Sequence, residues 1–320
     1  MNFDLDPEHL DVAAAARDFL SATASPAAAR AALDGGAAIQ PGRAELVKSG
    51  FATITVPERA GGGGGSVLDL AVVAEQAGRV LAGPSLVTFA RAAVLLDGAA
   101  LAGLAAGDLN VAIVDGGPVL DAACADTFLA LRDGALVRGP GTVTVREPID
   151  PTRGLGDVVL GETEVLVPDA AERWRRGERV GRTILAAEGL GAAARVLEMG
   201  VAYAKQRHAF GRAIGSYQAV KHMLVDVYVE VEQLRSLVWW AAWAADHAPD
   251  ELPLAAAAAK AAAATTLEHA AETVIQVHGG IGFTWEHDAH LYWRRSKVDR
   301  FLLGDDVAAH DEVARLAVTR

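Results

Sequence analysis

Three long stretches in the second half of the chain repeat apolar residues at the spacing of an α-helix. They cover residues 180–207, 217–247 and 254–277, and the last is very rich in alanine. Apolar positions three and four residues apart lie on one face of a helix, so each stretch predicts a helix with one buried face. Small side chains let such helices approach closely, which predicts a C-terminal domain resembling a four-helix bundle.

The first hundred residues predict shorter helices with one conspicuous interruption. Residues 10–23, 43–49 and 67–81 have helical apolar patterns. Five consecutive glycines at residues 61–65 separate the last two, and such a run predicts a flexible turn because it cannot support a helix interior. A phosphate-binding loop is the alternative, but no Lys-Ser/Thr pair follows the glycines as it would in a P-loop.

Between residues 110 and 167 the pattern changes to short segments rich in branched residues, separated by Gly, Pro and Asp. This change predicts a small antiparallel β unit. The expected fold class is therefore mainly α with a small β unit. It comprises an N-terminal helical domain (1–109), a β domain (110–168) and a C-terminal helical domain (169–320). The predicted strands are residues 111–114, 127–131, 142–145, 157–160 and 165–167.

Composition narrows the classes of function. The chain has 320 residues and a net charge of −12, and the absence of a Lys and Arg cluster argues against a nucleic-acid or anionic-membrane partner. Cys124 is the only cysteine, and the acidic residues 1–6 lack a signal-peptide pattern, so we expect a cytoplasmic protein without disulfides. The best candidate for a membrane span, residues 255–264, is short and contains Lys260.

Two sets of side chains could bind a ligand but have a simpler interpretation. Trp239 and Trp243 lie four apart on one helix face, where packing in the bundle or at a subunit interface is favoured over a ligand platform. His278, His287 and His290 are close in sequence, but no Cys/His spacing matches a zinc site. The sequence therefore predicts no metal site.

Two motifs in the C-terminal half carry the chemical information. They read RHAFG at residues 207–211 and QVHGGIG at residues 276–282. In this order and spacing, and within a helical–β–helical plan, they resemble the flavin-binding elements of the acyl-CoA dehydrogenase family. The resemblance is strong over residues 180–304, moderate over residues 50–84 and weak between them. It implies the fold of that family, with FAD as cofactor and an acyl-CoA as substrate.

The resemblance assigns roles to residues of the first motif and just after it. Arg207 matches the arginine that pairs with the pyrophosphate of FAD, a role that suits a planar guanidinium. Phe210 matches the aromatic residue that packs beside the cofactor. Gln218 matches the glutamine that follows this motif in the family.

The second motif is implied to contact the adenosine side of the flavin. Gln276 matches an amide group there, while Gly279 and Gly280 let the backbone approach the dinucleotide closely. In the family, the residues of both motifs serve a flavin held mainly by the neighbouring subunit. An exposed arginine and a helix-ending glycine pair are the alternative interpretation, which either motif alone would leave open.

The catalytic base of the family is a glutamate that removes the α-proton of the acyl thioester while the flavin accepts the β-hydride. It occupies one of two places. Counting from the second motif puts the first place at Leu303, which Gly304 follows; the other lies just before Arg182, at Gly181. Neither leucine nor glycine can accept a proton, so we predict no catalytic residue in this chain.

Other carboxylates are weaker candidates for a base. Glu188 lies two turns further along the same predicted helix and would point elsewhere. The acidic residues 305–306 follow the vacant position and belong to its rim in this register. Glu286 is expected to pair with Arg294 or Arg295.

The β unit gives a second departure from the family. There it is larger and carries a Thr-Glu-Pro-like segment and a Trp-centred strand that cover the subunit's own flavin and substrate. Neither is found between residues 110 and 167. We therefore predict a non-catalytic subunit that supplies FAD contacts to a longer, catalytic acyl-CoA dehydrogenase chain in an α2β2 heterotetramer. This arrangement resembles the actinobacterial heteromeric enzymes that dehydrogenate steroid side-chain CoA thioesters, with electron-transfer flavoprotein as the electron acceptor.

Two other hypotheses stay open at this point. The chain could be a self-sufficient homo-oligomeric acyl-CoA dehydrogenase with a displaced base, for which Glu188 is the leading candidate. It could also be a non-enzymatic scaffold that binds CoA thioesters. The retained Arg207 and Gln276 motifs argue against the scaffold, which has no need of them.

Overall fold

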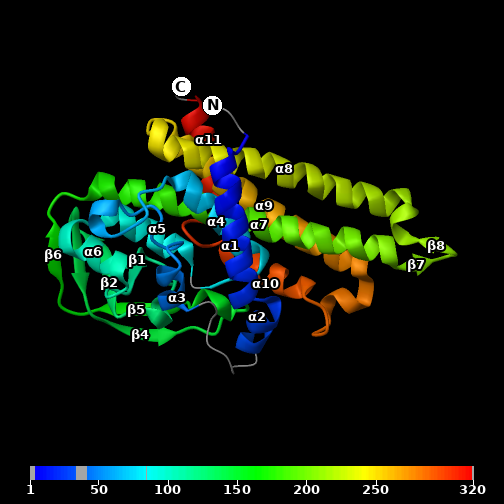
Figure 1. Ribbon diagram of the computed structural model, residues 1–320, viewed down its shortest axis with the longest axis horizontal. Coiled ribbons are helices and arrows are strands. Elements are labelled where there is room, and N and C mark those ends of the chain that lie inside the picture. Colours follow the sequence, from blue (N-terminus) through cyan, green and yellow to red (C-terminus); the bar gives the residue numbers. More distant parts are fainter. Residues whose placement is uncertain (1–3, 34–41, 84, 319–320) are drawn as a thin grey trace.

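The computed structural model describes residues 4–33, 42–83 and 85–318, so Met1 to Phe3 of the acidic N-terminal segment lie outside it. Three long helices run along the molecule, the strands of the β unit gather at one end, and a short hairpin protrudes at the other (Figure 1). The predicted fold class, mainly α with a small β unit, is confirmed. The division into three domains at residues 109 and 168 stays a prediction.

The three predicted long helices are present as α7, α8 and α9. Helix α7 begins at Ala171, well before residue 180. The prediction missed its first turns because they are rich in charged residues, which hide the apolar repeat. Two shorter C-terminal helices, α10 and α11, pack on α9. The bounds are α7 Ala171–Gln206, α8 Gln218–His247, α9 Leu252–His278, α10 Ala289–Asp299 and α11 Asp306–Val318.

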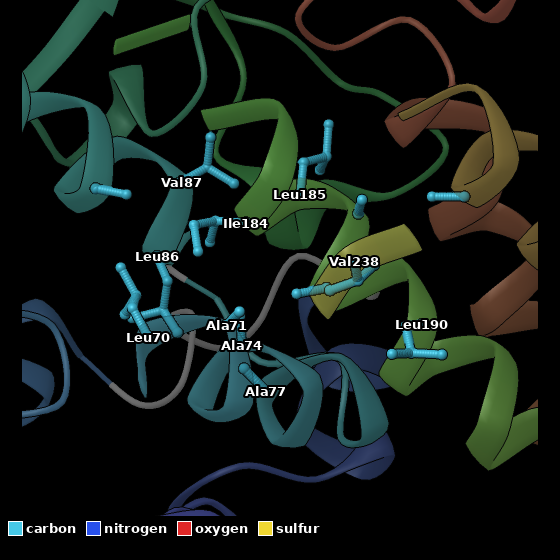
Figure 2. Close-up of a cluster of buried hydrophobic side chains, with 14 of the residues drawn as sticks. Leu70, Ala71, Ala74, Ala77, Leu86, Val87, Ile184, Leu185, Leu190 and Val238 are labelled. Carbon is cyan, nitrogen blue, oxygen red and sulfur yellow. The ribbon is translucent and has the colours of Figure 1, made fainter. Parts of the chain in front are cut away.

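The N-terminal helices cover one side of this bundle, and α4 and α5 pack directly on α7. Figure 2 shows the shared core, where Leu70 of α4, Leu86 of α5, Ile184 of α7 and Val238 of α8 are all buried. The three helices predicted here are confirmed, with three further short ones. Their bounds are α1 Pro7–Thr23, α2 Pro26–Leu33, α3 Arg43–Lys48, α4 Val67–Arg79, α5 Leu86–Leu95 and α6 Gly98–Ala106.

Helices α4 and α7 cross with their backbones in contact, and glycine makes this possible. A Cβ atom added to Gly78 of α4 would lie 1.9 Å from the carbonyl oxygen of Glu188. A Cβ added to Gly191 of α7 would lie 1.7 Å from the carbonyl oxygen of Glu75. No side chain fits at either position unless the helices separate, which would disturb the core that they share.

The run of five glycines forms a turn, as predicted, but a tightly held one rather than a flexible one. The amide of Gly63 donates to the carbonyl oxygen of Thr53, and the amide of Gly65 donates to that of Ile54 at 2.7 Å. A Cβ on Gly62 would lie only 2.2 Å from the Val56 carbonyl oxygen. The glycines therefore serve the close approach of two backbone segments.

The β unit contains a four-stranded sheet in the order β1-β2-β3-β6 and a separate β4-β5 pair. The prediction of an antiparallel unit is wrong in one place, because β1 and β2 are parallel. Residues 115–126 carry the chain back to the same edge before β2 begins. Strand β3 was not predicted. The strands are β1 Val111–Val114, β2 Thr127–Arg132, β3 Ala135–Gly139, β4 Gly141–Val145, β5 Gly156–Leu160 and β6 Glu164–Val167.

Across residues 4–33, 42–83 and 85–318, no helix combines enough length with enough apolar character to span a membrane.

Candidate functional site

The first motif forms a hairpin that projects from the end of the helical bundle (Figure 1). Helix α7 ends at Gln206, and Arg207 continues in an extended conformation. Strands β7 (His208–Ala209) and β8 (Arg212–Ala213) then pair across a two-residue turn. The turn residues Phe210 and Gly211 have φ of +52° and +80°. Positive φ at both positions is what a type I′ hairpin turn requires.

Phe210 is held in a costly conformation with its ring in solvent. Its side chain is 97% exposed, although the residue is large and apolar. A left-handed backbone costs a non-glycine residue roughly 1–2 kcal/mol. Tyr217 steadies the hairpin, because its hydroxyl donates to the Ala209 carbonyl oxygen at 3.0 Å and its ring lies under the Arg212 guanidinium. The chain thus presents an aromatic ring that has no packing role of its own.

The second motif ends helix α9 with backbone open to solvent. Gly279 has φ +65° and ψ −144°, a conformation that is essentially confined to glycine. A Cβ added to Gly279 or to Gly280 would meet no atom within 4 Å. By contrast, Gly282 is needed for packing, since its Cβ would lie 2.8 Å from the Ile275 carbonyl oxygen.

Tyr203 of α7 joins the two motifs. Its ring stacks on that of His278 with 4.1 Å between the centroids, and its hydroxyl lies 3.5 Å from the His278 carbonyl oxygen. Tyr203 precedes Arg207 by one turn, and His278 precedes the open glycines. The sequence-predicted cofactor residues of both motifs therefore lie at the same end of the bundle.

The polar side chains at this end of the bundle face solvent. Arg207, Gln218 and Gln276 are all exposed. Among the residues that the structure describes, none of these three side chains makes a hydrogen bond or ion pair with another. A guanidinium, two amides and a glycine backbone without obstruction form a donor set that suits the pyrophosphate and adenosine of FAD. The residues present therefore fit that cofactor.

The two positions expected for a base lie beside a different feature, a cavity of about 590 Å³. Leu303 and Gly304 line it, and Leu303 has a φ of +57°. Arg182 holds this turn, because its Nε donates to the Leu303 carbonyl oxygen at 2.9 Å. Gly181 is buried next to the same turn. Neither Leu303 nor Gly181 supplies a group that can accept a proton.

Glu188 is committed to a buried ion pair. Its carboxylate accepts a hydrogen bond from Arg153 Nη1 at 2.5 Å, and Arg153 also donates to both oxygens of Asp299. Burial raises the pKa of Glu188, and the neighbouring guanidinium opposes that shift. Glu188 is not among the residues lining the cavity beside Leu303. Its geometry is that of a structural residue.

Of the other acidic residues considered as a base, Asp305 and Asp306 have structural roles, and Glu286 has no partner among the described residues. Asp306 forms an ion pair with Arg300, and Asp305 accepts a hydrogen bond from the Ala308 amide at the start of α11. Glu286 is exposed, and the prediction that it pairs with Arg294 or Arg295 is wrong. Those arginines are directed elsewhere: Arg295 pairs with Asp150, and Arg294 donates to His290 and to the Ile149 carbonyl oxygen.

The three histidines form part of an aromatic layer behind the second motif. The rings of His278 and His287 lie 4.1 Å apart, and His290 contacts Trp285 edge to face. Burial lowers the pKa of all three imidazoles, which favours their neutral forms. In the described part of the chain, no group of three or more His, Cys, Asp or Glu side chains is placed to hold a metal ion.

The tryptophans of α8 belong to the packing of the bundle, as the sequence indicated. Trp239 is buried in the core, and Trp243 packs against that core while stacking on His247.

Sequence reasoning missed a buried arginine in the wall of the cavity. Arg91, the only charged residue in α5, is buried there. A single arginine within an apolar helical segment was the signal that could have revealed it.

Comparison with known proteins places these features in a family. Residues 6–103 match the N-terminal domain of acyl-CoA dehydrogenases, and residues 177–318 match the C-terminal domain. The chain is 40% identical over 285 residues to the acyl-CoA dehydrogenase IpdE2 of Mycobacterium tuberculosis, an alignment covering 85% of this chain and 86% of that protein.

Two solved structures of similar fold carry the names of paired proteins. One is the ChsE4-ChsE5 complex from Mycobacterium tuberculosis, with a TM-score of 0.85 and 24% identity over the whole of both chains. The other is a variant of the Tcur3481-Tcur3483 steroid ACAD, with a TM-score of 0.83 and 25% identity over 98% of each chain.

Proposed function

The chain belongs to the acyl-CoA dehydrogenase family, whose cofactor is FAD, and we propose that within it this chain is a non-catalytic subunit that clamps the flavin of a catalytic partner. The partner is a longer acyl-CoA dehydrogenase chain that carries the glutamate base. Two copies of each form an α2β2 heterotetramer with one FAD for each pair of unlike chains.

The observation that carries this proposal is the solvent-exposed Phe210 at the tip of the β7–β8 hairpin. A chain acting alone gains nothing from an aromatic ring held in water on a left-handed backbone. A ring in that position is suited to packing beside a flavin that another subunit holds. Arg207, at the base of the same hairpin, is exposed and available for the pyrophosphate.

The second motif extends the same clamp. Gln276 and the open backbone of Gly279 and Gly280 flank His278, which stacks on Tyr203 one turn before the hairpin base. Arg207 would pair with the pyrophosphate, Gln276 and Gln218 would donate to or accept from the adenosine side, and the two glycines would let the dinucleotide lie against the backbone. FAD, when bound, accepts the hydride from the β-carbon of the acyl group.

The missing base supports a division of labour between two chains. Gly181 and Leu303 supply no carboxylate, and the carboxylate of Glu188 is occupied by Arg153. Proton removal therefore falls to the partner. This geometry also speaks against a self-sufficient enzyme that uses Glu188, while the exposed clamp residues speak against a scaffold without flavin.

The substrate class that we propose is an acyl-CoA thioester with a steroid-type acyl group, and the electrons pass on to electron-transfer flavoprotein. This step rests on the steroid ACAD and the two-chain complex among the similar structures. It is an inference by analogy, since a shared fold does not itself fix a substrate.

The test is the flavin-to-protein ratio and native mass of the chain, purified alone and after co-expression with a longer family member that carries a base glutamate. We expect little flavin on the chain alone and a yellow heterotetramer with one FAD per pair of unlike chains. Arg207→Ala should lower the flavin content of that complex by about tenfold or more, because it removes a charge-assisted contact.

Arg132→Ala is the matched control. Arg132 is also exposed, but it lies in β2 at the opposite end of the molecule (Figure 1). The control complex should retain its flavin. A yellow homo-oligomer with one FAD per chain, or a complex whose flavin content does not respond to Arg207→Ala, would overturn the proposal.

A further inference from the structure

The cavity beside Leu303 lies apart from the residues of the flavin clamp. It has a volume of about 590 Å³, within the usual range for small-molecule sites. Helix α5, the start of α7, the loop after β1 and the turn between α10 and α11 enclose it. The apolar part of its wall comes from the side chains of Val87, Ile113, Leu120, Leu155, Trp174 and Leu302.

One cation is buried in this wall. Arg91 of α5 lines the cavity and is only 4% exposed. Its aliphatic stem packs on Gly181, where an added Cβ would lie 2.7 Å from Arg91 Cδ. Its Nη1 donates to Asp115 Oδ2 at 2.7 Å, and its guanidinium carbon lies 5.6 Å from the centre of the Trp174 ring. These contacts fix the position of the guanidinium.

The remaining edge of that guanidinium has no partner. Both Nε and Nη2 of Arg91 are buried without a hydrogen bond to any described residue. Buried donors are almost always paired, because an unpaired one loses its hydration without replacement. Nε and Nη2 lie side by side on one edge of the planar group. Two parallel N–H donors in this geometry match the two oxygens of a carboxylate.

The other charged groups around the cavity point to a monoanion. Asp115 and Glu178 also line it, and each is already paired with an arginine, Arg91 and Arg182 respectively. The other two cations of the lining are also paired, Arg146 with Asp157 and Lys297 with Glu268 and Glu272. With two carboxylates near a single unsatisfied guanidinium edge, a phosphate dianion is disfavoured, while a single carboxylate on an apolar body satisfies both the edge and the wall.

We propose that this cavity binds an apolar ligand that carries one carboxylate, with Arg91 Nε and Nη2 donating to its two oxygens. The site makes no use of the flavin clamp, so the two proposals stand or fall separately. No chemistry is assigned to the bound molecule. The place where the family keeps its base has become, in this chain, part of the wall of a binding pocket.

The experiment is isothermal titration of the purified full-length chain, in whatever assembly it forms, with octanoate and 1-adamantanecarboxylate. The matched neutral probes are octan-1-ol and 1-adamantanemethanol, and octyl phosphate tests the dianion. We expect one carboxylate per chain, with at least one of the two acids binding about tenfold or more tightly than its alcohol, as a charge-assisted pair implies. Flavin content is measured on the same samples.

Two variants of opposite expected sign make the test specific. Arg91→Met keeps the length of the stem and should remove the preference for the acid over the alcohol. Asp115→Asn keeps an acceptor for Nη1 but removes the negative charge, so it should tighten acid binding by about threefold or more while leaving the alcohol unchanged.

A third variant guards against misfolding of Arg91→Met. Gly117 lines the cavity, and a Cβ there would meet no atom within 4 Å, so Gly117→Trp should fold normally and narrow the cavity. It should weaken acid and alcohol alike. Equal affinity of acids and alcohols, no detectable binding of either acid, tighter binding of octyl phosphate than of octanoate, or acid binding unaffected by Arg91→Met would each overturn the proposal.

Discussion

Gly181 and Leu303 meet across the same small space, although they are far apart in the sequence. A Cβ built on Gly181 would lie 3.0 Å from Cδ1 of Leu303. The two positions at which the resemblance predicts a glutamate therefore direct a side chain to one place. In this chain, a leucine and the stem of Arg91 fill that place.

The tightness of this contact gives the first prediction. Gly181→Ala should destabilise the protein by about 1–3 kcal/mol, because the new methyl group overlaps Arg91 and Leu303. Gly189→Ala in the same helix is the control, since its Cβ would meet Ala263 at an ordinary 3.4 Å. The control should be neutral or slightly more stable, as alanine favours helix. Urea unfolding followed by circular dichroism measures both, and equal stability of the two variants would contradict the packing.

The hairpin gives a prediction in which stability and assembly move in opposite directions. Phe210→Asn creates an Asn-Gly pair, the sequence that a type I′ turn favours most. The isolated chain should be unchanged or more stable by up to about 1 kcal/mol, since strain at a positive φ is relieved. Flavin content and heterotetramer yield should nevertheless fall. Val159→Asn, at an exposed position of β5, is the control for a lost surface hydrophobic group.

Substitution of Glu188 tests whether its carboxylate has a structural role or acts as the catalytic base. Glu188→Gln leaves the buried Arg153 with one of its charged partners removed, and should cost about 2–4 kcal/mol of unfolding free energy. The assembled enzyme should keep its turnover per bound FAD, because the side chain does not reach the cavity. Dehydrogenation of an acyl-CoA by the folded complex, normalised to flavin, is the measurement. Complete loss of turnover would return Glu188 to the role of base.

Lys260 predicts an unusual dependence of stability on pH. It is buried in α9, where Nζ donates to the carbonyl oxygens of Asp299 and Arg300, and burial lowers its pKa to about 8 from an ordinary 10.5. Between these values the unfolded chain binds more protons than the folded one. This group's contribution to the unfolding free energy therefore rises as pH increases from 8 to 10.5 and is lost again on return to neutral pH.

Lys260→Met isolates that contribution. The stability of the variant relative to the natural chain should be greater at pH 7 than at pH 10, by an amount on the order of 2 kcal/mol. Chemical unfolding at the two pH values is the measurement. Lys297→Met, at a partly exposed position of α10, should show no such gain at pH 7. Burial lowers the pKa of Lys297, but its partners Glu268 and Glu272 outweigh that effect and raise it above the ordinary value. A pH-independent difference for Lys260→Met would show that the amine is not buried in its charged form.

Local sequence patterns were sufficient for the long helices and for the motifs that end them. The apolar repeat through residues 217–247 and 254–277 predicts α8 and α9 within a few residues, and glycine marks the end of α9. Arg207 and Gln276 lie at the C-terminal ends of α7 and α9, so their joint position follows once these two helices run in the same direction, with α8 as the antiparallel return. These features depend on residues close in sequence, which is why they can be inferred without coordinates.

The features that were missed depend on contacts between distant segments. Strand β3 carries Arg138 in a five-residue run and has little pattern of its own, and the parallel pairing of β1 with β2 depends on the path of the connecting loop. The convergence of Gly181 and Leu303 with the stem of Arg91 requires three separate elements to meet. The spacing of residues along the sequence does not reveal contacts of this kind between distant segments.

The exposed hairpin also limits how much of this protein a cell can keep unpaired. Phe210, together with Phe283 and Trp285 beyond the end of α9, presents aromatic surface to water. Chaperones and proteases act on chains that expose such surface, so under the proposed pairing any molecules made in excess of the partner are subject to removal or self-association. Balanced synthesis of the two proposed subunits is then a requirement set by the shape of a two-residue turn.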